Sequence, residues 1–357
     1  MSDKILLGTC IPDYRLKFFN CININTSNLL VVSGRSYHAK TVKYKKPFTG
    51  VYEVKNLFFF NRHLLIQILP FKKFFSATTV IMEFNLKNLS FYLVFFMRLI
   101  FNKPTFLWGH AWSKKGKGSK SEFIRLFFKK RCSGYIAYTD SQKKELEAQV
   151  PNQKIFAACN AIYDANEMTP KIIESQHINK FIYVGRLVSS KKPILLLRAF
   201  HTSIKNLPKD IELIIVGEGN EYKRLDNYIL DNKLTGRVKL LGHVSNYNTL
   251  RDLYSKSIAS LSPGAAGLSI TQSLGFGVPI IISKNEAHGP EIEASRSNIN
   301  SEFFETDNIN DLSSKIISFT KNKMFWIGNR ESISEFCREN YSIERMAAPF
   351  LKVFNTP

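Results

Sequence analysis

The feature that most limits the fold of this chain is the regular alternation of short apolar runs and helical patterns in its second half. The apolar runs end at glycine or small polar residues and lie at residues 181–184, 212–216, 238–241, 258–261 and 279–282. Longer stretches with a helical pattern separate most of them. Such alternation is typical of a mostly parallel sheet with helices on both faces. The sequence therefore predicts an α/β fold.

A cationic loop follows the first of these runs. Gly185 ends the predicted strand, Arg186 and Lys191 follow within one loop, and Pro193 opens a predicted helix. Backbone N–H groups, the positive end of a helix and two cationic side chains together favour an anion such as phosphate. Ligands of parallel sheets lie outside the carboxyl ends of the strands, where the loops after the other runs also lie. We therefore expect a phosphate site at this edge, with an ordinary pair of surface cations as the alternative.

Taken in order, these loops resemble the C-terminal domain of the group 1, family 4 retaining glycosyltransferases. The matching segments are residues 184–187 with Lys191, then 215–219, 241–244, 262–269 and 275–281. The resemblance implies the GT-B architecture, in which two Rossmann-like domains with parallel sheets face a central cleft. It implies an acceptor-binding domain at residues 1–165 and a donor-binding domain at 178–340. Asp, Asn, Glu, Ser, Gln and Pro170 gather at residues 164–178, which predicts a linker there. A final helix of about residues 340–357 is expected to pack back onto the first domain.

The resemblance also implies which residues bind a nucleotide-sugar. Arg186 and Lys191 would hold the diphosphate, and the loop at Val244 would contact the base through its backbone. The family usually carries a glutamate at each end of a nine-residue span, where this chain has Gly264 and Gln272. Gln272 can still hydrogen-bond a ribose, whereas Gly264 offers only its backbone. The expected donor-binding set is Gly185, Arg186, Lys191, Gly217, Val244, Gly264, Gly267, Leu268 and Gln272.

Four further residues are expected at the reaction centre or on the acceptor side. His110, which follows a predicted strand at 105–108, resembles the active-site histidine of related enzymes, and Glu291 matches a Pro-Glu pair of the family. Both are expected to be catalytic. Asp13 and Arg15 lie in a Pro-x-Tyr-Arg motif that the family places near the acceptor. The alternatives are a capping or buried histidine, a helix-start carboxylate, and a solvated loop pair.

The charge of the chain is high and uneven. The net charge is +21, and residues 1–177 hold 27 basic and 11 acidic residues. Residues 103–131 hold nine basic residues and one acid, and the nearby run at 89–97 is apolar but too short to span a bilayer. Basic residues attract anionic headgroups, and nearby apolar groups can insert shallowly. We therefore expect the N-terminal domain to lie on the cytoplasmic face of a membrane, with a core helix beside a solvated basic face as the alternative.

The cysteines and the absence of sequence signals bear on location and cofactors. The five cysteines are scattered without metal-ligand spacing, which favours a reducing, cytoplasmic compartment. We expect no signal peptide in residues 1–25, because Asp3, Lys4 and Asp13 bracket a short apolar run. No Asp-x-Asp motif lies near the expected site, so we expect neither a metal nor a bound cofactor.

Together these expectations describe a transferase. It would move a hexose-type sugar from a nucleotide-diphosphate donor to a lipid-linked glycan. The resemblance implies that stereochemistry is retained and that the pathway is the assembly of a bacterial surface polysaccharide, such as a capsule, O-antigen or lipopolysaccharide. The alternatives are a non-catalytic protein of the same fold, a sugar-nucleotide epimerase and a nucleic-acid-binding protein. The last alternative is suggested by charge alone, and no nucleic-acid motif supports it, so we expect no nucleic-acid partner.

Overall fold

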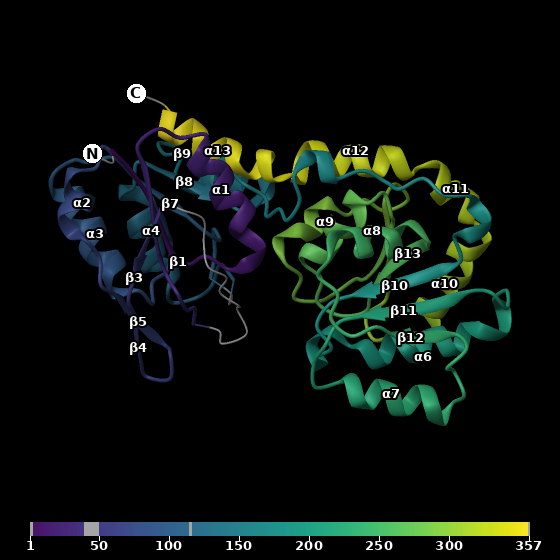
Figure 1. Cartoon of the computed structure of the whole chain (residues 1–357). Coiled ribbons are helices and arrows are strands. Elements are labelled where there is room, and N and C mark those ends of the chain that lie inside the picture. The colour runs from purple at the N-terminus through teal and green to yellow at the C-terminus, as the bar shows by residue number, and fades with distance from the viewer. Residues whose placement is uncertain (1–2, 39–49, 114–115, 356–357) are drawn as a thin grey trace. The chain divides into compact units, whose positions relative to one another are not determined.

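The computed structural model describes residues 3–38, 50–113 and 116–355. The chain divides into two compact units, each built around its own sheet (Figure 1). The first unit comprises Met1–Ile162 together with Ile343–Pro357, and the second comprises Tyr163–Ser342. Both units are Rossmann-like α/β folds, which confirms the predicted fold class.

The first unit contains a parallel seven-stranded sheet with the order β3-β2-β1-β6-β7-β8-β9. A separate antiparallel hairpin is formed by β4 (Asn56–Phe59) and β5 (Leu64–Gln67). The strands of the parallel sheet are β1 (Lys4–Cys10), β2 (Leu29–Gly34), β3 (Val51–Val54), β6 (Thr79–Glu83), β7 (Thr105–Trp108), β8 (Gly134–Ala137) and β9 (Lys154–Ala157).

Helices cover both faces of this sheet because its strands are apolar on both sides. On one face, Leu6, Ile81 and Ile136 belong to a core that includes side chains of α1 (Leu16–Ile24) and α13 (Ile343–Asn355). Phe18 of α1 meets Phe350 of α13 with ring centroids 5.0 Å apart. The residues next to them in the strands point to the opposite core, which is covered by α2 (Phe71–Ser76), α3 (Leu89–Ile100), α4 (Glu122–Arg131) and α5 (Asp140–Gln149).

The second unit contains a six-stranded parallel sheet with the order β12-β11-β10-β13-β14-β15. Helix α6 packs against α7 and α10, and α9 packs against α12, so helices flank the sheet on both sides (Figure 1). The strands are β10 (Lys180–Val184), β11 (Glu212–Val216), β12 (Val238–Leu240), β13 (Ser257–Ser262), β14 (Ile280–Ser283) and β15 (Ser301–Phe304). The helices are α6 (Pro193–Ser203), α7 (Tyr222–Asp231), α8 (Tyr247–Ser255), α9 (Leu268–Gly275), α10 (Ile309–Lys321), α11 (Lys323–Gly328) and α12 (Arg330–Tyr341).

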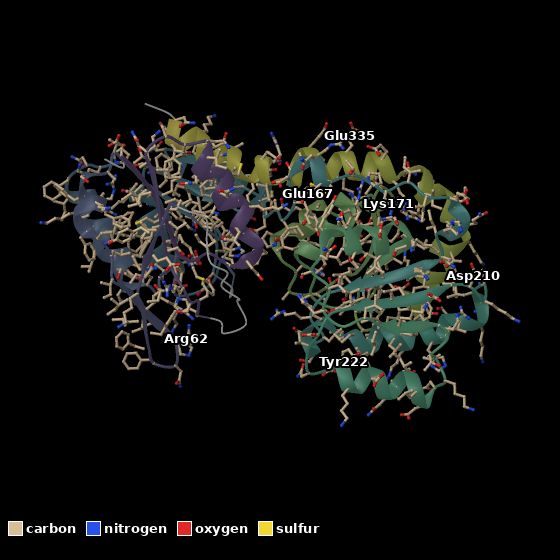
Figure 2. All side chains as sticks on the ribbon, viewed as in Figure 1. Arg62, Glu167, Lys171, Asp210, Tyr222 and Glu335 are labelled. Atoms are coloured by element: carbon tan, nitrogen blue, oxygen red, sulfur yellow. The ribbon has the colours of Figure 1, made fainter. Side chains whose placement is uncertain are left out.

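Residues 164–178, the expected linker, are part of the second unit in the structure. The hydroxyl of Ser334 donates to the carbonyl of Met168 at 2.7 Å, and the hydroxyl of Tyr247 donates to the carbonyl of Glu167 at 2.7 Å. Lys171 pairs with Asp252. Figure 2 labels Glu167 and Lys171 in this segment. The segment is thus bonded to α8 and α12, through two of its backbone carbonyls and the side chain of Lys171.

Two helix starts in the second unit have local causes. Helix α7 begins at Tyr222, because the preceding residues form a turn in which the Glu221 N–H donates to the carbonyl of Leu187 at 2.9 Å. Helix α8 begins at Tyr247, because the side chain of Asn246 caps it.

Each sheet has one point where the strand order reverses. In the first unit this point lies between β1 and β6, and in the second it lies between β10 and β13. Loops that leave adjacent strands on either side of such a point diverge and leave room for a ligand at the carboxyl edge. The predicted site residues can therefore be examined at these two edges.

Candidate functional site

In the second unit, a glycine turn after β11 holds the cationic loop after β10. Gly217 has a φ of +144°, and a Cβ placed on it would lie 1.8 Å from the carbonyl oxygen of Gly185. The Leu187 N–H donates to the carbonyl of Glu218 at 2.8 Å. Only glycine fits at Gly217, because both the backbone conformation and the close approach exclude a side chain. The two predicted residues Gly185 and Gly217 are thus in direct contact.

Two cations of this loop, Arg186 and Lys191, lie close enough to repel each other. Arg186 is exposed, whereas Lys191 is half-buried and donates a hydrogen bond from its ammonium group to the carbonyl of Ala265. Burial and then the charge of Arg186 lower the pKa of Lys191, and the carboxylate of Glu291 opposes this shift. An anion bound between Arg186 and Lys191 would relieve their repulsion. Lys192 is instead engaged with Glu286 and Asp307, at 2.6 Å each.

The small-residue loop after β13 lies directly on the cationic loop. The Ala265 N–H donates to the carbonyl of Ser190 at 3.2 Å. A Cβ placed on Gly264 would lie 2.5 Å from that same carbonyl oxygen and 2.8 Å from the carbonyl carbon of Lys191. Both neighbours are backbone atoms, which cannot rotate away. The position where the family carries a glutamate therefore has no room for a side chain in this conformation.

Glu291 lies at the start of α9, against Gly267, the predicted residue that precedes the predicted Leu268. Helix α9 begins at Leu268 with Gly267 as its N-cap. The Glu291 carboxylate is buried, and its Oε2 atom lies 3.6 Å from an ideal Cβ position on Gly267. A carboxylate is stabilised at a helix N-terminus by the helix dipole. The Glu291 carboxylate thus interacts favourably with this helix N-terminus and also opposes the lowering of the pKa of Lys191.

His288 fastens the small-residue loop from behind. Its Nδ1 atom accepts a hydrogen bond from the Ala266 N–H at 3.1 Å, and its Nε2 atom lies 2.9 Å from the carbonyl oxygen of Ser283. These contacts fit the neutral ring with its proton on Nε2. Burial lowers the pKa of His288, which favours the same neutral form.

Gln272, the expected ribose contact, is buried in α9 and already has two hydrogen-bond partners. Its amide nitrogen donates to the hydroxyl of Tyr163 at 2.8 Å, and its amide oxygen accepts from the hydroxyl of Tyr254 at 3.3 Å. Burial raises the pKa of Tyr163 to about 12, so this hydroxyl stays neutral. A ribose hydroxyl would have to use the remaining capacity of the amide.

Val244 lies in the loop between β12 and α8. This loop joins the same edge through Gly242, whose carbonyl accepts from the Gly217 N–H at 2.7 Å. The edge of the second unit therefore brings together the loops after β10, β11, β12 and β13. Gln272 is buried within α9 and does not belong to these loops.

In the first unit, Arg15 and His110 both contact one aromatic residue, Tyr138. A terminal nitrogen of Arg15 donates to the Asn160 side chain at 2.8 Å and to the Tyr138 hydroxyl at 3.3 Å. The guanidinium carbon also lies 4.8 Å from the ring centroid of Trp108. The exposed His110 ring is 4.6 Å from the Tyr138 ring. The structure thus connects two predicted residues through Tyr138, which the sequence reasoning did not name.

Glu83, at the end of β6, is the other residue that the sequence reasoning missed at this edge. Its carboxylate accepts from the Thr9 N–H at 2.7 Å and from the hydroxyl of Tyr37 at 3.3 Å. The charge of Glu83, followed by burial, raises the pKa of Tyr37. Asp13 is exposed and accepts from the N–H of Tyr14 at 2.8 Å. The available signal for Glu83 was its position directly after the apolar run Val80-Ile81-Met82.

Within the residues that the structure describes, no three His, Cys, Asp or Glu side chains are grouped as metal ligands would be. In the same residues, no helix is both long enough and apolar enough to cross a bilayer.

Two Rossmann-like units, each with a polar edge at a strand-order reversal, define the GT-B class of proteins. The family model described as "Glycosyl transferases group 1" matches residues 165–339, nearly the whole second unit. The second unit is thus a group 1 glycosyl transferase domain, as the resemblance indicated.

Individual relatives are distant. The chain is 23% identical over 241 residues to the poly(ribitol-phosphate) alpha-N-acetylglucosaminyltransferase of Staphylococcus aureus, covering 68% of this chain and 48% of that protein. It thus spans about half the length of this relative. It is 24% identical over 277 residues to an uncharacterized glycosyltransferase of Haemophilus influenzae, covering 73% and 75%. The Anabaena protein Alr3699/HepE, solved in complex with UDP, matches 98% of both chains with a TM-score of 0.69 at 13% identity, which supports the fold alone.

Proposed function

We propose that this protein transfers a sugar from a nucleotide-diphosphate donor to a glycan acceptor. The observation that carries the proposal is the pair of mutually repelling cations, Arg186 and Lys191, at the strand-order reversal of the family-matched unit. A diphosphate is a dianionic group that would neutralise both cations and accept hydrogen bonds from the loop backbone. As the leaving group of the reaction, it would gain further stabilisation as its charge develops.

The donor is proposed to be a UDP-sugar, and catalysis is proposed to need no metal. HepE was solved with UDP, and the Staphylococcus relative is named for N-acetylglucosaminyl transfer. Lys191 and Arg186 would supply the positive charge that a divalent ion supplies elsewhere. Because Gly264 has no side chain, the donor sugar would be contacted there by backbone only, with Glu291 and His110 as the proposed catalytic side chains.

The acceptor is proposed to bind at the edge of the first unit that carries Arg15, Asp13 and His110. Arg15 is held by Asn160 and Tyr138, so its guanidinium is already oriented before a ligand binds. We further propose that the acceptor is lipid-linked, that transfer retains stereochemistry, and that the product is a bacterial surface polysaccharide. In this proposal the protein is cytoplasmic and works at the inner face of the membrane.

A thermal-shift titration of the purified chain tests the donor site. UDP, GDP, CMP and their sugar conjugates would be compared, with Arg186→Ala and Lys191→Ala as site variants and Arg198→Ala, an exposed arginine of α6, as the matched control. A ligand that binds only the folded state raises the melting temperature. We expect a shift with a uridine diphosphate that the two site variants lose and the control keeps.

The turnover assay then separates the transferase from its alternatives. Mass spectrometry of reactions with a lipid-linked glycan should show one added sugar, and NMR should show the donor's anomeric configuration retained. UDP binding without transfer to any acceptor would favour a non-catalytic protein. A free epimerised sugar product without an acceptor would favour a sugar-nucleotide epimerase.

A further inference from the structure

Helix α3 is apolar on every side, although only one side faces the core. Phe91, Val94 and Phe95 are buried against the sheet. On the opposite side, Leu89, Leu93, Phe96 and Ile100 repeat at helical spacing and are exposed, Leu93 by 62% and Ile100 by 73%. A helix without a polar face is normally covered on both sides. The exposed side of α3 is therefore a candidate contact surface.

Both neighbouring helices extend this apolar surface. Phe75 of α2 and Phe101, just after α3, are both exposed, with ring centroids 4.9 Å apart. On the other side, Phe127 of α4 meets Phe96 at 5.9 Å. Phe123, one helical turn before Phe127, is 84% exposed. Contiguous apolar patches on a soluble domain mark interaction sites.

Cations surround the patch, and acids are almost absent from the segments that build it. Residues 68–104 contain one acid, Glu83, and residues 119–133 contain one, Glu122. Glu83 bonds to the Thr9 N–H at the strand edge, and Glu122 is buried beside Lys129. Among the described residues, the surrounding cations form no ion pair within 4 Å: Lys72, Lys73, Lys103, Lys130 and Arg131. Lys114 and Lys115, which also belong to the basic run at 103–131, lie outside the described residues.

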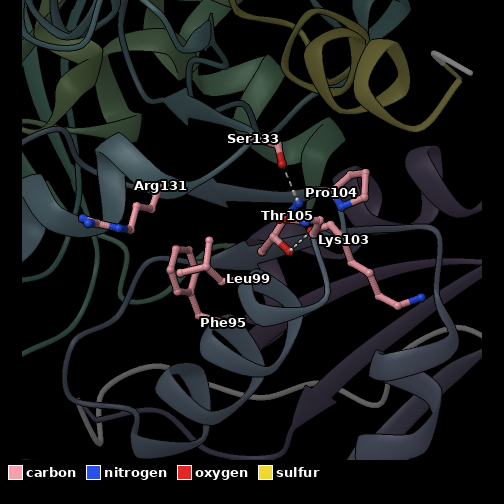
Figure 3. A pocket seen from close by; sticks show the side chains of 8 residues that line it. Phe95, Leu99, Lys103, Pro104, Thr105, Arg131 and Ser133 are labelled. Atoms are coloured by element: carbon pink, nitrogen blue, oxygen red, sulfur yellow. Dashed lines mark hydrogen bonds between the residues drawn. The ribbon is translucent and has the colours of Figure 1, made fainter.

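A cavity of about 180 Å³ lies at the C-terminal end of the patch (Figure 3). Its apolar lining comes from Phe95 and Leu99, and Lys103 and Arg131 contribute cationic side chains. The Arg131 guanidinium lies 4.3 Å from the ring centroid of Phe127, so this cation sits at the edge of the aromatic cluster. A cavity lined by both apolar and cationic side chains is complementary to the apolar and anionic parts of a lipid.

We propose that the exposed side of α2, α3 and α4, here called the lipid face, docks onto an anionic bilayer surface. The aromatic and aliphatic side chains would insert at the boundary of headgroups and acyl chains, and the cations would contact anionic headgroups. Helix α3 begins after a short loop that follows β6, so the lipid face starts near the edge proposed to bind the acceptor. The inference rests on the proposed use of a lipid-linked acceptor and names the surface that would meet the membrane.

Vesicle sedimentation of the full chain tests the lipid face. Vesicles of phosphatidylcholine with phosphatidylglycerol would be compared with vesicles of phosphatidylcholine alone. The apolar variant is Leu93→Ser with Ile100→Ser, and its matched control is Leu230→Ser with Ile172→Ser, residues of the second unit that are 58% and 91% exposed. The charge variant is Lys130→Gln with Arg131→Gln, matched by Lys223→Gln with Arg224→Gln.

The wild type is expected to sediment with the anionic vesicles and to be released by salt. Each lost cation should weaken binding about fivefold, and the apolar variant should weaken it about tenfold or more, while both controls keep wild-type binding. Equal binding by face and control variants, or no wild-type binding, would overturn the proposal. The proposal would also be overturned if light scattering showed that the wild type is a dimer, the apolar variant is a monomer, and neither binds vesicles. The UDP melting shift on the same samples reports the donor site separately, so a failed lipid face leaves that result standing.

Discussion

Restoring the family's glutamate at Gly264 should damage this protein. The intuitive expectation is that Gly264→Glu returns a missing sugar contact and raises activity. The structure predicts the opposite, because a Cβ at this position would lie 2.5 Å from the Ser190 carbonyl oxygen and 2.9 Å from the Cα atom of Lys191. Real Cβ atoms do not approach backbone atoms so closely, so one of the two loops would have to move.

The size of the effect follows from which contacts must move. Separating the loops strains the Ala265 N–H bond to Ser190 and the Lys191 bond to the Ala265 carbonyl. Overpacking of this kind costs about 1–3 kcal/mol, which in a unit of this size corresponds to a fall in melting temperature of about 2–12 °C. Because Lys191 would also lose its position, UDP affinity should fall together with stability.

Differential scanning calorimetry and UDP titration check this prediction against a matched control. Gly236 lies in the same unit and is exposed, and a Cβ on it would meet nothing within 4 Å. Gly236→Glu adds the same side chain and charge and should change neither quantity. Gly264→Ala should show much of the loss, because the clash begins at the Cβ atom. If Gly264→Glu melted like Gly236→Glu and transferred sugar faster than the wild type, the argument from loop packing would be refuted.

Three further predictions concern single side chains. Arg98→Met should lower the free energy of unfolding, measured in urea, by about 3 kcal/mol or more, because the buried guanidinium donates to five oxygens. The exposed Arg198→Met should leave this free energy nearly unchanged. Equal losses in the two variants would refute the reasoning. Burial lowers the pKa of His288, so the unfolded chain takes up a proton there first and the melting temperature should fall as the pH drops below about 6.5. His288→Gln should make the melting temperature less dependent on pH. The same dependence in the variant and the wild type would contradict the prediction. Gly217→Ala should abolish the rise in melting temperature that UDP causes, since its Cβ would lie 1.8 Å from the carbonyl oxygen of Gly185. Gly236→Ala should keep this rise. A rise in both variants would refute the prediction.

Much of the carboxyl edge of the second unit was predictable because it depends on local sequence. A strand that ends at glycine, a turn with two glycines and a proline at a helix start all act over a few residues. The parallel sheet then places the loops after Val184, Val216 and Ser262 at one edge. The order of these loops also carried the resemblance to the family that matches residues 165–339.

The partners of individual side chains were not predictable in the same way. Gln272 was expected to face a ribose, yet Tyr163 and Tyr254 occupy its amide. Glu83 was not singled out, because nothing in its neighbourhood along the chain reveals that Thr9 and Tyr37 lie beside it. Residues 164–178 were expected to be a linker because they are polar, although their backbone carbonyls and Lys171 bond to helices far along the chain.

In the second unit, the sequence by itself determined strands β10 to β14, their alternation with helices and the loops that reach the carboxyl edge, because each depends on short-range patterns of burial and backbone freedom. Only the tertiary structure decided that Gly264 packs against the Ser190 carbonyl and that one side of α3 stays uncovered. It also decided that Lys191 donates to the carbonyl of Ala265 and that the charges of Arg186 and Glu291 act on its pKa. These features arise where loops and helices distant in sequence come into contact. Their distances depend on how whole elements pack, which no local pattern encodes.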